Sequence, residues 1–182
     1  MKTLSHLLVL AGSQYAINVQ DAEQFLGGVI FGLIQKDDLS EIKQCLTDAE
    51  GVEEEVNKAI EYFAKGDVQD ILLGIEEMGK LLQELPTDLK ECVAMKSDLE
   101  RIETWAAIFK NPLELLKTVT TNLIKDYAKI FADVSKTTSD IGEAKYYNAG
   151  EDIADVLVLT LGAVPAKGDA EVQPENIPVT QW

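Results

Sequence analysis

The sequence predicts an all-α protein: a single-domain antiparallel helical bundle of about seven to eight helices, with an irregular C-terminal tail. Three features indicate this class. Helix-start signals recur along the chain, apolar residues repeat every three or four positions in the longest predicted helix, and the links between predicted helices are short. A chain of 182 residues, 46% of them hydrophobic, can form one core without a metal or a lattice of disulfides.

Helix starts are marked by a capping side chain followed three residues later by Glu or Gln, whose side chain can reach back to the amide of the cap. This pattern occurs four times, at Asp21, Asp38, Ser97 and Asn111. The expected helices span residues 21–35, 39–49, 52–65, 68–84, 87–95, 98–110, 112–136 and 140–162.

Glycine and proline set several of these boundaries. Gly66 is expected to end the third helix and Asp67 to cap the fourth. Pro86 and Thr87 mark the next boundary in the same way, and Pro112 takes the first position of a helix, where its missing N–H removes no hydrogen bond. Short links of this kind make successive helices run antiparallel.

The helix over 112–136 carries the clearest apolar stripe, which we expect to be its buried side. The stripe consists of Leu116, Val119, Leu123, Ile124, Tyr127, Ile130, Phe131 and Val134. The segment 153–161 is apolar almost all round, which favours a central buried helix, although its valine and isoleucine content leaves a strand open. The helix is preferred because no partner strand is visible.

The two ends of the chain differ from its body. Residues 1–19 hold a possible signal peptide, with a cleavage point before Gln14, and an uncleaved N-terminal helix is the alternative. Residues 20–162 form the predicted bundle domain. Residues 163–182 contain three prolines and are expected to be an extended or disordered tail, unless Trp182 and its apolar neighbours dock onto another subunit.

Cys45 and Cys92, the two cysteines of the chain, are the disulfide candidate. In an oxidising compartment an even number of cysteines favours one bridge, here across 47 positions. Closing a loop of that length stabilises a fold by roughly 4 kcal/mol on the chain-entropy model. Two buried free thiols are the alternative if the leader is not a secretion signal.

Gly28 and Gly32 interrupt an otherwise amphipathic helix, at a cost of about 1 kcal/mol each relative to alanine. Small residues four positions apart let two helix backbones approach closely, so both are close-packing candidates, with an interface or a ligand groove as the alternative. Tyr146 and Tyr147 are adjacent, so we expect one ring to face inward and the other to face solvent or a partner. Together with Trp182, they are the interface candidates.

The formal net charge of −16, from 16 basic and 32 acidic side chains, disfavours nucleic acid and anionic membranes as partners, because both bind clustered cations. No stretch reaches the ~20 apolar residues of a transmembrane helix. The single histidine, His6, lies in the possible leader, and no catalytic, phosphate-binding, cofactor or zinc motif is visible. We therefore expect no enzymatic activity, no cofactor and no metal site.

Four segments of the chain carry a resemblance to a known group. They are FLGGVIFGLI, LSEIKQCL, ELPTDLKEC and YYNAGEDIADVLVLTLGAVP, and they lie between residues 20 and 165. They resemble small secreted helical proteins of single-celled eukaryotes, a group without a characterised activity. The resemblance implies secretion and the cysteine bridge, and it implies no activity or site.

Together these features predict a secreted, non-catalytic helical module that acts by protein–protein contact, with itself or with another protein, as a subunit of an extracellular assembly. The alternative is a helical-bundle carrier that holds a lipid or another small apolar ligand beside Gly28 and Gly32. An intracellular soluble protein is the alternative location.

Overall fold

A computed structural model describes residues 16–166 of the chain. The predicted cleavage point before Gln14, most of the predicted tail and Trp182 lie outside these residues. Within them the structure holds seven α-helices, two short 3-10 segments and no strand, which confirms the predicted all-α, single-domain bundle. The helices are α1 (Val19–Ile34), α2 (Leu39–Cys45), α3 (Ala49–Lys65), α4 (Val68–Asp88), α5 (Lys96–Ala106), α6 (Pro112–Gly142) and α7 (Tyr146–Leu161), with η1 (Val93–Met95) and η2 (Ala107–Lys110) on either side of α5.

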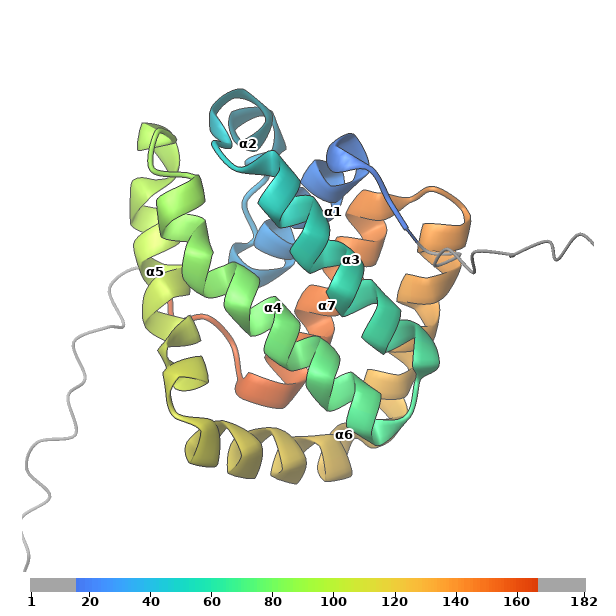
Figure 1. Ribbon diagram of the computed structural model, residues 1–182. Helices are drawn as coiled ribbons and strands as arrows, with labels where there is room; N and C mark the ends of the chain where they lie inside the picture. Colours follow the sequence, from blue (N-terminus) through green and yellow to red (C-terminus); the bar gives the residue numbers. More distant parts are fainter. Residues whose placement is uncertain (1–15, 167–182) are drawn as a thin grey trace, which may run out of the picture.

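The segment predicted as a central helix is the centre of the bundle. α7 packs against α1 on one side and against α6 on another, and α3 and α4 form an antiparallel pair that crosses in front of α7 in Figure 1. α5 packs against α4 at one end. The buried side chains of α7 are almost all small or aliphatic: Ala149, Gly150, Ile153, Ala154, Val156 and Leu157, with Asp152 and Thr160.

Two glycines allow α1 and α7 to touch through their backbones. A Cβ built on Gly28 would overlap the carbonyl oxygen of Tyr147, and one built on Gly150 would overlap the carbonyl oxygen of Phe25. A Cβ on Gly32 would overlap the side chain of Ala154. The conformational cost of the α1 glycines is therefore offset by close helix packing, with α7 filling the space beside them.

Two of the predicted capping residues work as expected, because caps depend on neighbours in the sequence. The side chain of Asp67 accepts a hydrogen bond from the Asp70 amide at 2.9 Å, and Asn111 accepts one from the Glu114 amide at 3.4 Å. Gly66 ends α3 with φ at +74°, a left-handed conformation that glycine adopts at little cost.

The other three predicted caps, Asp21, Asp38 and Ser97, do not cap a helix with their side chains, although α2 begins at Leu39 as expected. α1 begins after Asn18, whose side chain accepts a hydrogen bond from the Asp21 amide at 3.1 Å, so Asp21 lies inside the first turn. Asp38 makes no side-chain cap, because its carboxylate pairs with Lys36 at 2.8 Å. α5 begins one residue before Ser97, directly from η1 and without a side-chain cap.

Pro86 does not end a helix, contrary to the prediction. α4 continues through Pro86 to Asp88, so the expected helix over 87–95 is replaced by a turn and η1. Because Pro86 lies in the last turn of α4, its missing N–H removes one backbone hydrogen bond there and leaves the earlier turns intact. Thr47, in the link between α2 and α3, donates its amide and its hydroxyl to the Asp88 carbonyl at 2.9 and 2.8 Å, and so caps the extended end.

The expected boundary between 136 and 140 is also wrong. α6 continues to Gly142, and the chain reverses at Ala144, which takes φ of +57°. The Lys145 amide donates to the Asp140 carbonyl at 2.7 Å and closes the turn. Because an alanine takes the place of the usual glycine, the sequence carries no stop signal here.

Side chains of α5 form hydrogen bonds with the backbone of the segment that follows α7. The indole of Trp105 donates to the Gly162 carbonyl at 2.9 Å, and the guanidinium of Arg101 donates to the Pro165 carbonyl at 3.0 Å. Residues 162–166 therefore run along α5 before the described part of the chain ends.

We expect Gly150→Ala to lower the free energy of unfolding by about 1–3 kcal/mol, because the added methyl would push α7 away from the α1 backbone. Urea denaturation monitored by circular dichroism measures this. Gly142→Ala is the matched control: nothing lies within 4 Å of its Cβ position, so stability should stay the same or rise by up to about 1 kcal/mol. Equal effects of the two substitutions would contradict the close-packing role of Gly150.

Candidate interaction surface

Exposed apolar side chains gather on α6. Within residues 16–166, five of the seven large hydrophobic side chains that are exposed belong to this helix. They are Leu113, Leu116, Ile124, Tyr127 and Phe131, which we call the open stripe. Leu113 and Ile124 are 82% and 74% exposed, far more than a folded monomer needs to leave uncovered.

The open stripe corrects a prediction about α6. The apolar residues of this helix were expected to form its buried side, and four of the eight do, namely Val119, Leu123, Ile130 and Val134. The other four, Leu116, Ile124, Tyr127 and Phe131, are 42–74% exposed. The apolar arc of α6 is therefore wider than the area that α7 and α3 cover.

A bend divides α6 and its open stripe. Asp126 has φ of −110° and ψ of 20°, which are not helical values. We call the straight part before it, residues 112–125, the α6 arm. Beyond the bend, the rings of Tyr127 and Phe131 stack with their centres 6.0 Å apart, and Phe131 lies beside Gly66. The α6 arm runs along the lower edge of the molecule in Figure 1.

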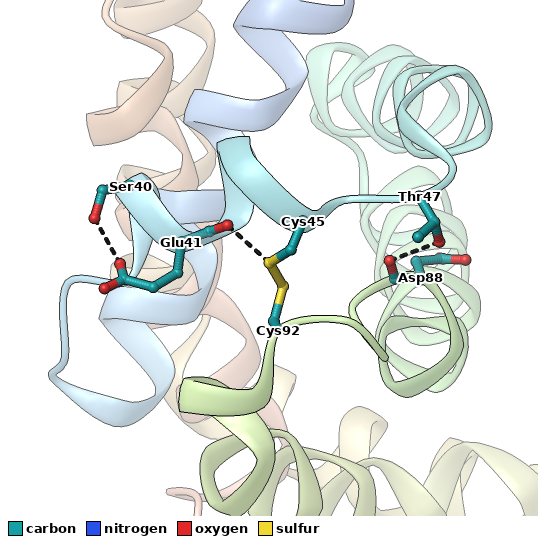
Figure 2. Close-up of a disulfide and its surroundings, with 6 residues drawn as sticks. All are labelled: Ser40, Glu41, Cys45, Thr47, Asp88 and Cys92. Carbon is teal, nitrogen blue, oxygen red and sulfur yellow. Dashed lines mark hydrogen bonds between the residues drawn. A yellow bond between two sulfur atoms is a disulfide. The ribbon is translucent and has the colours of Figure 1, made fainter.

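Cys45 and Cys92 form a disulfide, with their Cα atoms 5.4 Å apart. The bridge joins the end of α2 to the turn after α4, next to the point where Thr47 caps α4 (Figure 2). The Cys45 sulfur lies 2.8 Å from the Glu41 carbonyl oxygen, a contact only, since a bridged sulfur carries no hydrogen. The bridge and the Thr47 cap together fix the α2–α3 link on the end of α4.

An open hollow of about 520 Å³ lies on one side of the bridge. Its lining combines apolar and charged side chains: Pro86, Leu89, Cys92, Val93, Leu99, Lys90, Lys96, Glu100 and Glu103. It differs in place from the groove expected beside Gly28 and Gly32, where a ligand would have to displace α7.

The predicted interface tyrosines are both half-buried, so the expected contrast between an inward and an outward ring is wrong. Tyr147 packs against Phe31, with ring centres 6.1 Å apart. Burial, together with the negative charge of Asp37, raises the pKa of Tyr147 to about 12. Tyr146 belongs to the side chains around the core.

Carboxylates at two places resist ionisation. Burial raises the pKa of Glu55 on α3 to about 7, and the negative charges of Glu84 and Asp88 on α4 add to the effect. Between α6 and α7, burial raises the pKa of Asp152 although Lys136 donates a hydrogen bond to it. The like charge of Asp140 nearby raises it further.

Residues 16–166 contain no group of three or more metal-ligating side chains that could hold an ion. No helix among them is both long enough and apolar enough to cross a bilayer.

The chain matches the model of one protein family, SctB-like, described as secreted protein B-like, over residues 8–161. The match covers most of the chain, including all seven helices in full. The chain therefore belongs to the SctB-like family and is a secreted helical protein. No curated protein and no solved structure matches it.

We expect the double substitution Cys45→Ser and Cys92→Ser to lower the free energy of unfolding by roughly 4 kcal/mol, the value for a loop of this length on the chain-entropy model. Urea denaturation with and without a reducing agent measures the difference. Reduction should destabilise the wild-type protein and leave the double variant unchanged. A wild-type protein that is insensitive to reduction would contradict a stabilising role for the bridge.

The raised pKa of Glu55 predicts a pH-dependent stability. Between its ordinary value of 4.5 and about 7, the folded protein binds more protons than the unfolded chain, so stability is highest below that window and falls as the pH rises through it. Glu55→Gln should remove this decrease and give a higher melting temperature than wild type at about pH 8, with a much smaller difference at about pH 4. Glu103→Gln, on the exposed side of α5, is the control and should follow wild type at both pH values. A Glu55→Gln protein with the wild-type pH profile would refute the assignment.

Proposed function

We propose that the protein is a non-catalytic secreted module that acts by protein–protein contact, as a subunit of an extracellular assembly, and that the open stripe of α6 is its contact surface. The observation that carries this proposal is the concentration of exposed large apolar side chains on one helix. Apolar side chains spread singly over a surface need no explanation, whereas a row of them on one element is typical of a binding surface.

The free energy gained by burying the exposed side chains of α6 is large enough to support a stable contact. Burying one leucine or isoleucine side chain is worth about 1.5–3 kcal/mol, and the side chains at 113 and 124 are almost fully open. Two such side chains at the centre of an interface supply a substantial part of a micromolar affinity, which corresponds to about 8 kcal/mol. Because Leu113 and Ile124 lie outside the core, leaving them exposed has little effect on the free energy of folding.

The secreted location supports the same role. A disulfide persists in the oxidising environment outside the cell, and here it holds the α2–α3 link on the end of α4. A helical fold cross-linked by a disulfide is more rigid, and a rigid helix such as α6 can present its side chains to a partner in a fixed arrangement.

Ile124→Glu tests the proposal. The side chain is 74% exposed, so the fold should tolerate the change, while the new charge should prevent an apolar partner surface from closing over it. We expect light scattering after size-exclusion chromatography of the freshly secreted material to give a complex for wild type and a monomer for Ile124→Glu.

Asn148→Glu is the matched control, because it adds the same charge at an exposed position of α7. It should keep the wild-type complex. A complex of wild-type mass for Ile124→Glu, or its loss in Asn148→Glu as well, would contradict a contact through α6.

A further inference from the structure

We infer that Asp140 of α6 and Asp152 of α7 share one proton, and that the loss of this proton as the pH rises loosens the contact between the two helices. This inference goes beyond the proposed function, because it concerns a switch inside the fold and not the open stripe. It is carried by two buried carboxyl groups that lie together at the α6–α7 contact, each with one oxygen that lacks a hydrogen-bond donor.

The two carboxyl groups meet in a buried place. Asp140 and Asp152 are 7% and 4% exposed, and their side chains are within hydrogen-bonding reach of each other. The Oδ2 atom of each is buried and accepts no hydrogen bond from the described part of the chain. Buried acceptors without a donor are costly, and two carboxylates so close together do not both ionise readily. One proton between them supplies the missing donor and removes one of the two charges.

The donors that the structure places near this pair are already in use. The ammonium of Lys136 donates to Oδ1 of Asp152 and neutralises one charge. The buried hydroxyl of Thr137 donates to a backbone carbonyl of its own helix at 2.9 Å. Lys145, in the turn after α6, pairs with Glu143. A proton is therefore the donor that remains for the Oδ2 atoms of the pair.

The surrounding charges favour keeping this proton. Burial raises the pKa of Asp152, and the hydrogen bond and charge of Lys136 lower it. The charge of Asp140 and its hydrogen bond with Asp152 raise it again. None of these leading charges comes from α1, which packs against another side of α7. Three more acidic side chains add negative charge around the pair: Asp133 on α6, and Glu151 and Asp155 on α7.

Loss of the proton weakens the contact between α6 and α7. Because the pKa of Asp152 is raised above its ordinary value of 3.8, the pair contributes its full stability below that value and loses it as the pH rises through the pKa of the folded state. The proton then passes to solvent, and two adjacent carboxylates repel each other with one lysine to neutralise them. Asp140 lies in the last turn of α6, beyond the bend at Asp126, so this end of α6 is the part we expect to loosen.

The first experiment follows the side-chain carboxyl groups of the purified full-length protein by carbon-13 NMR as the pH is changed. We expect Asp140 and Asp152 to titrate together in two steps, the second of them above the ordinary pKa of 3.8. Asp155→Asn removes an exposed charge from the same surroundings and should keep both steps. Independent titrations of the two groups, or the loss of both protons in one step near the ordinary value, would overturn the shared proton.

The second experiment measures the loosening by hydrogen exchange and mass spectrometry. Asp140→Asn keeps the shape of the side chain and offers Asp152 an amide donor at every pH. At about pH 8, the backbone amides of residues 136–142 should exchange about tenfold more slowly in this variant than in wild type, and at about pH 4 the two proteins should match.

Asp155→Asn is the matched control for hydrogen exchange, because it makes the same substitution at an exposed position of α7. It should follow wild type at both pH values, and the amides of α3 and α4 should exchange at the same rate in all three proteins. Equal exchange of wild type and Asp140→Asn at about pH 8, or an equal slowing in Asp155→Asn, would overturn the link between the proton and the α6–α7 contact.

Discussion

The packing of the whole bundle depends on the close approach of α1 and α7. Because Gly28 and Gly150 carry no side chains, the backbones of the two helices come into direct contact. α7 is then enclosed on the side of α1, so that Phe25 and Ile153 are completely buried. The remaining exposed side of α7 has to be covered by a long helix, and α6, the longest one described, packs along it. The position of α6 at the outside of the molecule thus follows from a contact made by two glycines.

The acidic composition explains how the few basic side chains are used. Lys36 pairs with Asp38 and Asp98, each at 2.8 Å, and so connects the link after α1 to the start of α5. These two carboxylates raise the pKa of Lys36, so its charge is secure at any pH the secreted protein meets. Lys136 serves the buried Asp152 in a similar way between α6 and α7. Other lysines, Lys117 among them, are not tied to the core and give the α6 arm its local positive charge.

The sequence predicts those features that depend on neighbouring residues, and it fails where distant segments meet. Asp67 and Gly66 could be recognised because a cap needs only its own turn. The continuation of α4 through Pro86 could not, since the end of α4 is capped by Thr47, which lies 41 positions away. The reversal at Ala144 had no signal because alanine takes the left-handed conformation there. The bridge between the two cysteines was expected from their number, whereas Gly150, the partner of Gly28, was missed because one glycine in a helix shows no spacing pattern.

The open stripe shows that the periodicity of apolar residues does not by itself predict which of them are buried. A repeat of three and four residues shows that one side of α6 is apolar, and it does not show which chain covers that side. Val119 and Leu123 are buried, whereas Leu116 and Ile124, which lie close to them in sequence, are exposed and widen the apolar arc beyond what the neighbouring helices cover. An arc of that width suits a helix that lies between two neighbours. The chain supplies α7 and, over a shorter stretch, α3 on the covered side of this arc. A high net charge keeps such a molecule soluble while its apolar row is open.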